Sequence, residues 1–366
     1  MDSIIFEAPF NSLSFGNVSF NLAREMFKKG MSVSLFPFKN SFDFSAFADK
    51  LDPSLKEWLE ESTNSRFENY KKDTPCLKVW HINGSEQRLS KNSFLYSFYE
   101  LNSPTLTECI LLNSHDHTFF SSSYASGEFK KSGCDNTSFV PLGFDVDFES
   151  NEGKRLDDKI HFGLIGKWEK RKHTSKIIQT WASKYGDNND YQLTCCVVNP
   201  FLKEKKMNEL ISKTLSGKRF SNINFINRLK TNSEVNTLHN AIDIDLSGAS
   251  GAEGWNLPSF NSTAKGKWSI VLNATGHKDW ANEENSILMQ PSGKISAYDG
   301  TFFQEGSKFN QGEIYDFSTD DLLNSMDIAV SKVKNKEENK KGLMLKDQFS
   351  YEKTLDKILS EMESLV

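Results

Sequence analysis

The stretch DIDLSGASGAEGWNLPSFNSTAKG, residues 243–266, is the most informative part of this chain. It predicts a buried strand, then a loop of small residues that contains Glu253, then a short helix opened by Leu257 and Pro258. Such a loop brings a carboxylate and several free backbone N–H groups to one point above a sheet. Glu253 could cap the helix near Pro258 or accept hydrogen bonds from the hydroxyl groups of a ligand, and the pattern leaves both roles open.

A second stretch, FGLIGKWEKRK at residues 162–172, predicts a strand, a turn at Gly166 and a cluster of cations. Lys167 and the three cations at 170–172 could neutralise a diphosphate, and a helix beginning at Thr174 would add oriented N–H groups. A solvated basic turn is the structural alternative. The stretch matches neither a Walker loop nor the G-x-G-x-x-G fingerprint. Together, the two stretches favour an enzyme that handles a nucleotide-linked sugar.

Length and composition limit the remaining possibilities. A chain of 366 residues with 25% charged and 37% hydrophobic residues is typical of two globular domains. The net charge of −5 gives no global attraction to nucleic acid or anionic membrane. Five cysteines without a C-x-x-C pair argue against a disulfide framework and a zinc site. We find no signal peptide and no apolar run near the ~20 residues of a membrane span, so we expect a cytoplasmic protein.

Strands and helices alternate along both halves of the chain. This pattern predicts an α/β fold of two parallel, doubly wound, Rossmann-like domains. We expect an N-terminal domain over residues 1–150, a C-terminal domain over 151–345, and a C-terminal helix over 346–366 that returns toward the first domain. The polar stretch 146–158 is the expected linker, whereas residues 40–74 show no clear pattern.

The expected elements follow hydrophobic periodicity and the positions of Gly and Pro. The expected strands are 4–7, 32–37, 77–82, 94–99, 118–122, 138–144, 161–166, 193–198, 223–229, 242–247 and 269–273. The expected helices are 18–29, 105–113, 124–131, 174–185, 203–215, 233–240, 320–334 and 351–363.

Several motifs resemble those of the retaining GT-B glycosyltransferases of family four, the group 1 transferases. GKWEKRKH at 166–173 is similar to G-R-x-x-x-x-K-G, and EGWNLPSFNSTAKG at 253–266 is similar to E-G-F-G-L-P-x-L-E-A-M-A-x-G. Looser similarity covers the segments 15–36 and 98–145, so the resemblance spans nearly the whole chain. It implies the GT-B fold, in which two Rossmann-like domains face each other across a cleft.

The resemblance also implies a donor site. Lys167 and Lys172 match the two basic diphosphate contacts, although Lys167 replaces the usual Arg and lacks its bidentate fork. Glu253 matches the acidic residue that meets the donor sugar. Asn261 replaces the second Glu, which grips the ribose; an amide can still pair with a diol but supplies no negative charge. The other expected donor-binding residues are Gly16, Gly166, Arg171, Arg228, Gly254, Trp255, Asn256 and Leu257.

Two residues of the first half are candidates for the cleft. Glu100 stands where many relatives carry a histidine near the reacting sugar, and some branches of the family carry Glu there. The resemblance therefore implies a catalytic role for Glu100 beside Glu253, Lys172 and Lys167. His81 is a second candidate, for the rim of the cleft.

Two groups of potential metal ligands stand at positions that do not suit a metal site. The D-x-D strings at 145–147 and 243–245 are of a type that binds a metal in single-domain GT-A transferases, but one lies at the linker and the other inside a strand. His115 and His117 are interpreted as a turn between a helix and a strand. We therefore expect neither an essential metal nor a cofactor.

The implied reaction is retaining transfer of a hexose or pentose from a UDP-, GDP- or ADP-sugar, in which the departing phosphate takes the acceptor proton. The acceptor, whether glycan, lipid, protein or nucleic acid, is not indicated. One alternative is a weak or inactive homologue that binds nucleotide or sugar, and the substitution at Asn261 favours it. Another is a phage-type enzyme acting on modified DNA bases, suggested by the lysines of 154–176. A glycoside hydrolase is disfavoured because we find no pair of flanking carboxylates.

Overall fold

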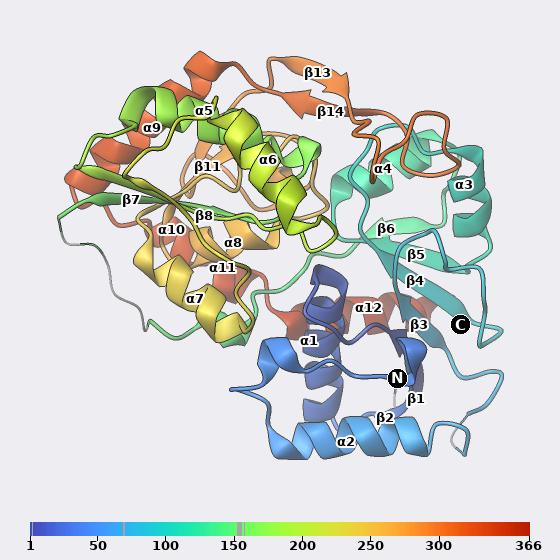
Figure 1. Ribbon diagram of the computed structural model, residues 1–366. Helices are drawn as coiled ribbons and strands as arrows, with labels where there is room; N and C mark the ends of the chain where they lie inside the picture. The colour runs from blue at the N-terminus through green and yellow to red at the C-terminus, as the bar shows by residue number, and fades with distance from the viewer. Residues whose placement is uncertain (2, 69, 152–155, 157) are drawn as a thin grey trace.

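The computed structural model describes residues 1, 3–68, 70–151, 156 and 158–366. Within these residues the chain forms two six-stranded sheets and a two-stranded ribbon. Figure 1 shows the two large sheets in separate lobes, each accompanied by helices. Residues 152–155 and 157 of the expected linker lie outside the described residues.

The first sheet is parallel and has the strand order β2-β1-β3-β4-β5-β6. Its strands are β1 (Ser3–Ala8), β2 (Ser32–Pro37), β3 (Cys76–Val79), β4 (Ser93–Ser97), β5 (His117–Phe120) and β6 (Thr137–Phe139). Its helices are α1 (Ser14–Lys28), α2 (Pro53–Asn64), α3 (Leu106–Asn113) and α4 (Ser123–Lys131), with short 3-10 turns at Phe38–Asn40, Ser45–Phe47 and Val146–Phe148. Val18, Leu22 and Met26 recur at helical spacing and are fully buried, which holds α1 on the sheet.

The second sheet is also parallel and has the order β12-β11-β10-β7-β8-β9. Its strands are β7 (Ile160–Ile165), β8 (Tyr191–Cys196), β9 (Ile223–Phe225), β10 (Ile244–Asp245), β11 (Trp268–Leu272) and β12 (Ile287–Met289). Its helices are α5 (Thr174–Tyr185), α6 (Glu204–Thr214), α7 (Asn232–Ala241), α8 (Leu257–Ala264) and α9 (Thr319–Lys334), with 3-10 turns at Lys170–Lys172 and Thr275–Asp279. The two sheets confirm the expected α/β fold of two Rossmann-like domains.

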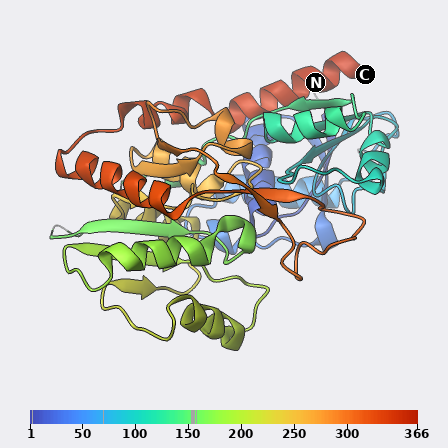
Figure 2. The same cartoon turned by 90° about the horizontal axis from the view of Figure 1, so that it is seen from above.

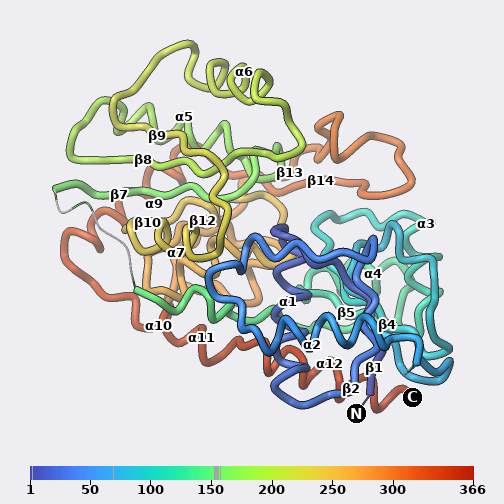
Figure 3. The backbone as a smooth tube through the Cα atoms, turned by 60° about the horizontal axis from the view of Figure 1, so that its bottom comes forward, coloured from blue at the N-terminus to red at the C-terminus, as the bar shows by residue number. Residues whose placement is uncertain are grey.

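The chain ends on the first domain. After α10 (Lys340–Leu343) and α11 (Leu345–Gln348), helix α12 (Tyr351–Leu365) packs against α1. Figures 2 and 3 show the C-terminal end of the chain on the first lobe, near the N-terminus. Leu355, Ile358 and Met362 are buried in the same apolar cluster as α1. A side chain at Gly143 would meet the backbone of Tyr351 at 2.2 Å, so only glycine admits this close approach. The expected return of the C-terminal helix is confirmed.

Some elements differ from the sequence expectations. Residues 40–74, which showed no pattern, contain α2, whose N-terminus is capped by Asp52 accepting a hydrogen bond from the Ser54 N–H. The strand expected at 242–247 is only two residues long, because the backbone turns away at Ser247. Residues 247–256, which contain Glu253 and lead to α8, are called the acidic loop. A ribbon of β13 (Gly293–Ser296) and β14 (Glu313–Asp316) was not expected. The domain boundaries stay a prediction.

Candidate active site

A cleft of about 320 Å³ lies between the two domains. Its walls come from segments that follow β4, β7, β8 and β9 and from the N-terminal ends of α1 and α8. Ligands of open α/β sheets bind at this position, outside the carboxyl ends of the strands. The cleft brings together twelve of the predicted site residues: Glu100, Gly166, Lys167, Arg171, Lys172, Arg228, Glu253, Gly254, Trp255, Asn256, Leu257 and Asn261.

The thirteenth predicted residue, Gly16, lies behind the wall. Ser14 and Asn17 beside it line the cleft. A Cβ atom on Gly16 would stand 2.1 Å from the carbonyl oxygen of Asn11, so glycine lets the first turn of α1 pack against the preceding loop. The structure therefore gives Gly16 a role in shaping this wall.

Glu253 is held by two cations and a hydroxyl group. Its Oε2 atom lies 3.0 Å from Nη1 of Arg171, and its Oε1 atom contacts Nζ of Lys172 and accepts a 2.8 Å hydrogen bond from Ser250. Burial alone would raise the pKa of Glu253, but the Lys172 ammonium and the Arg171 guanidinium outweigh burial and hold that pKa well below its usual range. Glu253 is therefore an ionised carboxylate on the cleft wall.

Glu169, which the sequence reasoning missed, orders the cations. Its carboxylate lies 2.9 Å from Nζ of Lys167 and 2.9 Å from Nε of Arg171. Arg171 also donates from Nη1 to the carbonyl of Ala252 at 2.7 Å. Charges thus alternate from Lys167 through Glu169, Arg171 and Glu253 to Lys172. An acidic residue inside a run of cations was the signal that could have identified Glu169.

The backbone after the cations leaves amide groups without a side-chain cap at the start of α5, where Thr174 and Ser175 line a neighbouring pocket outside the cleft. Gly166 has a φ of 153°, and a Cβ atom there would lie 3.5 Å from Cδ of Lys172. His173 adopts the left-handed conformation with a φ of 51° at the N-cap of α5, and its side chain does not cap the helix. The first turn of α5 therefore keeps N–H groups that can meet an anion.

The opposite wall belongs to the first domain. Glu100 follows β4 and lines the cleft. Burial raises the pKa of Glu100, while the Arg171 guanidinium opposes this effect from across the cleft. His81 is not among the described residues that line the cleft; its ring lies 4.4 Å from the ring of Phe15, between centroids.

The loop after Glu253 contacts the first domain. The Gly254 carbonyl accepts a 3.0 Å hydrogen bond from Ser121, and a Cβ atom on Gly254 would lie 3.1 Å from Phe98. Asn256 caps α8 in the left-handed conformation, with its Oδ1 atom 3.4 Å from the Ser259 nitrogen. The cap of α8 is therefore Asn256, and the alternative of Glu253 as the cap is not observed.

Asn261 and Arg228 lie at other parts of the cleft. The Asn261 side chain is 5% exposed, and within the described residues its Oδ1 atom has no hydrogen-bond partner. Arg228 donates from Nη2 to the hydroxyl of Ser12 at 2.6 Å, which joins the two domains. Trp255 contributes to the wall while its ring packs against Phe349, 5.3 Å away between centroids.

The D-x-D pair at 145–147 has structural partners. Arg24 lies 3.5 Å from Asp145 and 2.9 Å from Asp147, and Asn232 of the second domain donates to Asp147 at 3.1 Å. His115 lies 3.0 Å from the Ser93 hydroxyl. Among the described residues we find no group of three His, Cys, Asp or Glu side chains placed to bind a metal. Nor does the described part of the chain contain a helix long and apolar enough to cross a bilayer.

Solved structures share this architecture. The sucrose-phosphate synthase from Thermosynechococcus elongatus matches with a TM-score of 0.67 at 12% identity, covering 100% of this chain and 99% of its own. HepE from Anabaena, solved with UDP and glucose, matches with a TM-score of 0.66 at 12% identity over 100% of both chains. A glycosyltransferase from Rickettsia africae gives 0.67 at 11% identity, over 99% and 98%.

These similar structures are GT-B glycosyltransferases, and the chain has the GT-B fold. At these identities the likeness establishes the fold alone. No protein-family model matches the sequence, and no curated protein matches it significantly.

Proposed function

We propose that this protein transfers a sugar from a nucleoside-diphosphate sugar to an acceptor hydroxyl, with retention of anomeric configuration. The observation that carries the proposal is the contact between Lys172 and Glu253, which are 81 positions apart and meet on the wall of the interdomain cleft. A cation suited to phosphate and a carboxylate suited to sugar hydroxyls therefore lie side by side at the carboxyl ends of the strands of the second sheet.

The donor diphosphate would bind at the cations. Lys167 and Lys172, which both line the cleft, neutralise the negative charge that grows on the leaving diphosphate. Lys172 contacts Glu253 in the free protein, so the diphosphate competes with this carboxylate for the ammonium. Arg171 keeps Glu253 in position during this exchange, because its guanidinium also bonds Glu169 and the Ala252 carbonyl.

The donor sugar would lie between Glu253 and Glu100. In the reaction the bond from the anomeric carbon to the phosphate oxygen breaks, and the electron pair leaves with the diphosphate. The acceptor oxygen bonds to the anomeric carbon on the same face, and its proton passes to the departing phosphate. Glu253 favours the oxocarbenium-like state, because its carboxylate is ionised beside the developing positive charge.

The nucleoside and the acceptor would occupy different parts of the cleft. Asn261, whose amide oxygen is unpartnered within the described residues, would meet the ribose diol. The first domain would hold the acceptor, and closure of the domains would exclude water from the donor. We propose a cytoplasmic enzyme that needs no metal, because its own cations supply the charge that a metal would otherwise bring.

The test is a donor screen followed by product analysis. UDP-, GDP- and ADP-sugars are added to the protein and to its Lys172→Ala variant, with and without EDTA. Thermal shift reports binding, and donor hydrolysis without acceptor reports chemistry. UDP-glucose is the first donor to try, since HepE was solved with it. Product NMR then gives the anomeric configuration. Absence of both binding and hydrolysis with every donor would refute the proposal.

A further inference from the structure

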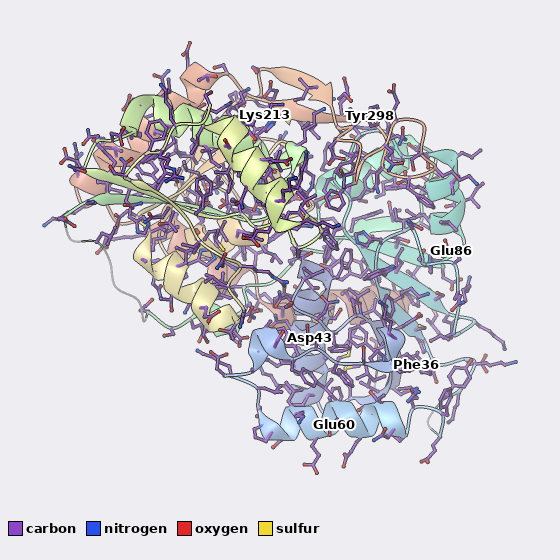
Figure 4. The ribbon with its side chains drawn as sticks, viewed as in Figure 1. Phe36, Asp43, Glu60, Glu86, Lys213 and Tyr298 are labelled. Carbon is purple, nitrogen blue, oxygen red and sulfur yellow. The ribbon has the colours of Figure 1, made fainter. Side chains whose placement is uncertain are left out.

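Residues 290–316 form a segment that leaves the second domain and reaches the first. The segment runs from β12 through β13, continues as a loop over 297–312 and returns as β14. Figure 1 shows the loop beside α3 and α4, and Figure 4 labels Tyr298 where the segment crosses between the lobes. We call this segment, residues 290–316, the clasp.

Strand β14 of the clasp is attached to the loop that carries Glu253 and to the segment that carries Lys172. The Tyr315 nitrogen donates to the carbonyl of Gly251 at 3.0 Å, two positions before Glu253. The Tyr315 carbonyl accepts a 2.7 Å hydrogen bond from Nε2 of His173, the residue after Lys172. A Cβ atom on Gly251 would stand 2.3 Å from the Tyr315 carbonyl, so glycine is required for this contact. Movement of β14 would therefore displace the acidic loop.

The loop at the far tip of the clasp, around residues 308–311, is attached to the first domain. Glu108 on α3 accepts a 2.8 Å hydrogen bond from the Asn310 nitrogen, and Thr105 donates to the Lys308 carbonyl at 2.6 Å. Ser103 and Gln311 form an isolated antiparallel bridge. Apolar contacts support these bonds, because residues of the clasp and of the first domain share one buried cluster, which includes Leu95, Tyr99, Leu101, Phe129, Ala297, Phe303 and Ile314.

Residues 298–302 of the clasp also contact residues 167–172, the cation segment. Lys170 donates to the Tyr298 carbonyl at 2.9 Å, and Nζ of Lys167 lies 5.8 Å from the ring centre of Phe302. The clasp thus contacts the cation segment, the acidic loop and the first domain. A packed segment with these three attachments can transmit a change in domain spacing to the site.

We propose that the clasp couples closure of the two domains to the placement of Glu253 and Lys172, and that Glu108 is the positioning residue that holds it. No residue of the clasp, which the structure describes throughout, lines the cleft, so the clasp acts through domain spacing: when residues 297–312 release from α3 the domains separate, and the donor enters. Release loosens β14 and the acidic loop, and rebinding assembles the site around the donor. The catalytic consequence rests on the proposed glycosyl transfer, whereas the effect on domain spacing does not.

Glu108 is suited to this task by its burial. The side chain is 1% exposed and accepts hydrogen bonds from the Asn310 nitrogen, the Thr105 nitrogen at 2.8 Å and the Tyr99 hydroxyl at 3.2 Å. Glu108→Ala leaves both backbone donors without this acceptor, which weakens the attachment. Glu108→Gln keeps an acceptor oxygen and should restore part of it. Glu128→Ala on α4 is the matched control, since that carboxylate pairs with exposed Lys131 at 2.7 Å.

The first experiment measures domain spacing in solution without any substrate. Small-angle scattering should give a larger radius of gyration for Glu108→Ala, and a still larger one when residues 297–311 are replaced by a short Gly-Ser linker. Circular dichroism checks that each variant is folded. Equal radii for the wild type and the folded variants would overturn the proposal whether or not the protein transfers sugar.

The second experiment locks the clasp. The backbones of Ser103 and Gln311 pair directly, so a Ser103→Cys/Gln311→Cys variant can form a disulfide. Oxidation should abolish turnover of the accepted donor, and reduction should restore it, because the donor then enters again. Oxidised wild type and the single variant Ser103→Cys control for the native cysteines. Full turnover by the oxidised double variant would show that release is not needed and would overturn the proposal.

The third measurement separates positioning from simple stability. In Glu108→Ala the ratio of donor hydrolysis to transfer should rise, because water enters the loosened site, and kcat for transfer should fall by up to about a hundredfold, the cost of a ~1 Å misplacement. Glu108→Gln should recover part of this loss. An unchanged ratio in a folded Glu108→Ala variant would count against a positioning role.

Discussion

At the scale of single residues, the cleft depends on a few charges with several partners each. Glu253 is shared by Lys172, Arg171 and Ser250, and Glu169 is shared by Lys167 and Arg171. Burial lowers the pKa of Lys172, and Glu253 opposes this effect. Because Glu169, Arg171 and Glu253 are buried and paired, removal of one partner leaves another uncompensated.

Lys172 is the most direct test of the proposed chemistry. Lys172→Ala should lower kcat by about 10²–10³, or about 2.7–4 kcal/mol, because a positioned cation no longer meets the leaving diphosphate. Steady-state kinetics with the accepted donor measure this loss. Lys213→Ala is the control, since Lys213 is exposed at the end of α6, away from the cleft (Figure 4). Turnover in Lys172→Ala equal to that of the control would reject the assigned role.

Asn261 tests the placement of the nucleoside. Its amide oxygen is buried and has no partner among the described residues. Asn261→Glu should tighten nucleotide binding by about tenfold, because hydrogen bonds to a charged group contribute about 1.5–3 kcal/mol. Isothermal titration calorimetry with UDP, GDP and ADP measures the change, and Asn261→Gln controls for side-chain length. An affinity unchanged from the wild type would mean that Asn261 does not face the ribose.

At the scale of elements, α8 shows how a short helix holds the acidic loop in place. Asn256 has a φ of 70° and accepts from the Ser259 nitrogen at its N-cap. Its amide also donates to the Ser247 carbonyl at 2.8 Å and pairs with His277 at 2.9 Å. One side chain therefore ties the end of β10 to the start of α8. Burial lowers the pKa of His277 to about 4, so the imidazole is neutral in this contact at pH 7.

Asn256 is the residue through which this element can be tested. Asn256→Ala should lower the free energy of unfolding by about 1–2 kcal/mol for the lost cap and by a further ~1–2 kcal/mol for the left-handed backbone. Asn256→Gly removes the side chain but accepts the positive φ, so its loss should be smaller. Urea unfolding of the three proteins gives the comparison. Equal losses in the two variants would show that backbone conformation does not contribute.

Prediction of elements from sequence succeeded where one local signal dominated. Helix α5 and strand β2 have the bounds that periodicity predicts. It failed for α2, since Asp52 and Pro53 open that helix but few of its side chains are buried, which leaves little apolar pattern. It failed also for β13 and β14, because all four residues of β13 are exposed and the ribbon is held by pairing with β14.

At the scale of the whole molecule, the two domains are joined by a buried polar network. Asn232 of α7 donates to Asp145 at 3.4 Å and to Asp147 at 3.1 Å, and Arg24 of α1 pairs with both carboxylates. Burial, together with the neighbouring charge of Asp147, raises the pKa of Asp145 to about 6. Arg24 and hydrogen bonds from Asn21 and the Asp147 nitrogen oppose this rise.

This network makes stability depend on pH. Because the folded state binds the Asp145 proton more tightly than the unfolded state, its contribution to stability is complete below pH 3.8 and is lost as pH rises through about 6. The loss is on the order of 3 kcal/mol. Asp145→Asn cannot titrate at this position. Between pH 4 and pH 7 the wild type should therefore lose free energy of unfolding relative to the variant. Parallel pH profiles in urea unfolding would contradict this expectation.

The amino-acid sequence by itself determined the alternation of strands and helices, the cation cluster at 166–172 and the loop of small residues around Glu253. These features depend on local periodicity and on Gly and Pro in turns. Only the tertiary structure decided that Glu253 pairs with Lys172 and Arg171, that Glu169 orders the cations and that residues 290–316 reach α3. Glu253 meets the cations because β7 and β10 are neighbours in the second sheet, and the segment 290–316 reaches α3 because of how the two sheets face each other. No short stretch of sequence records either arrangement.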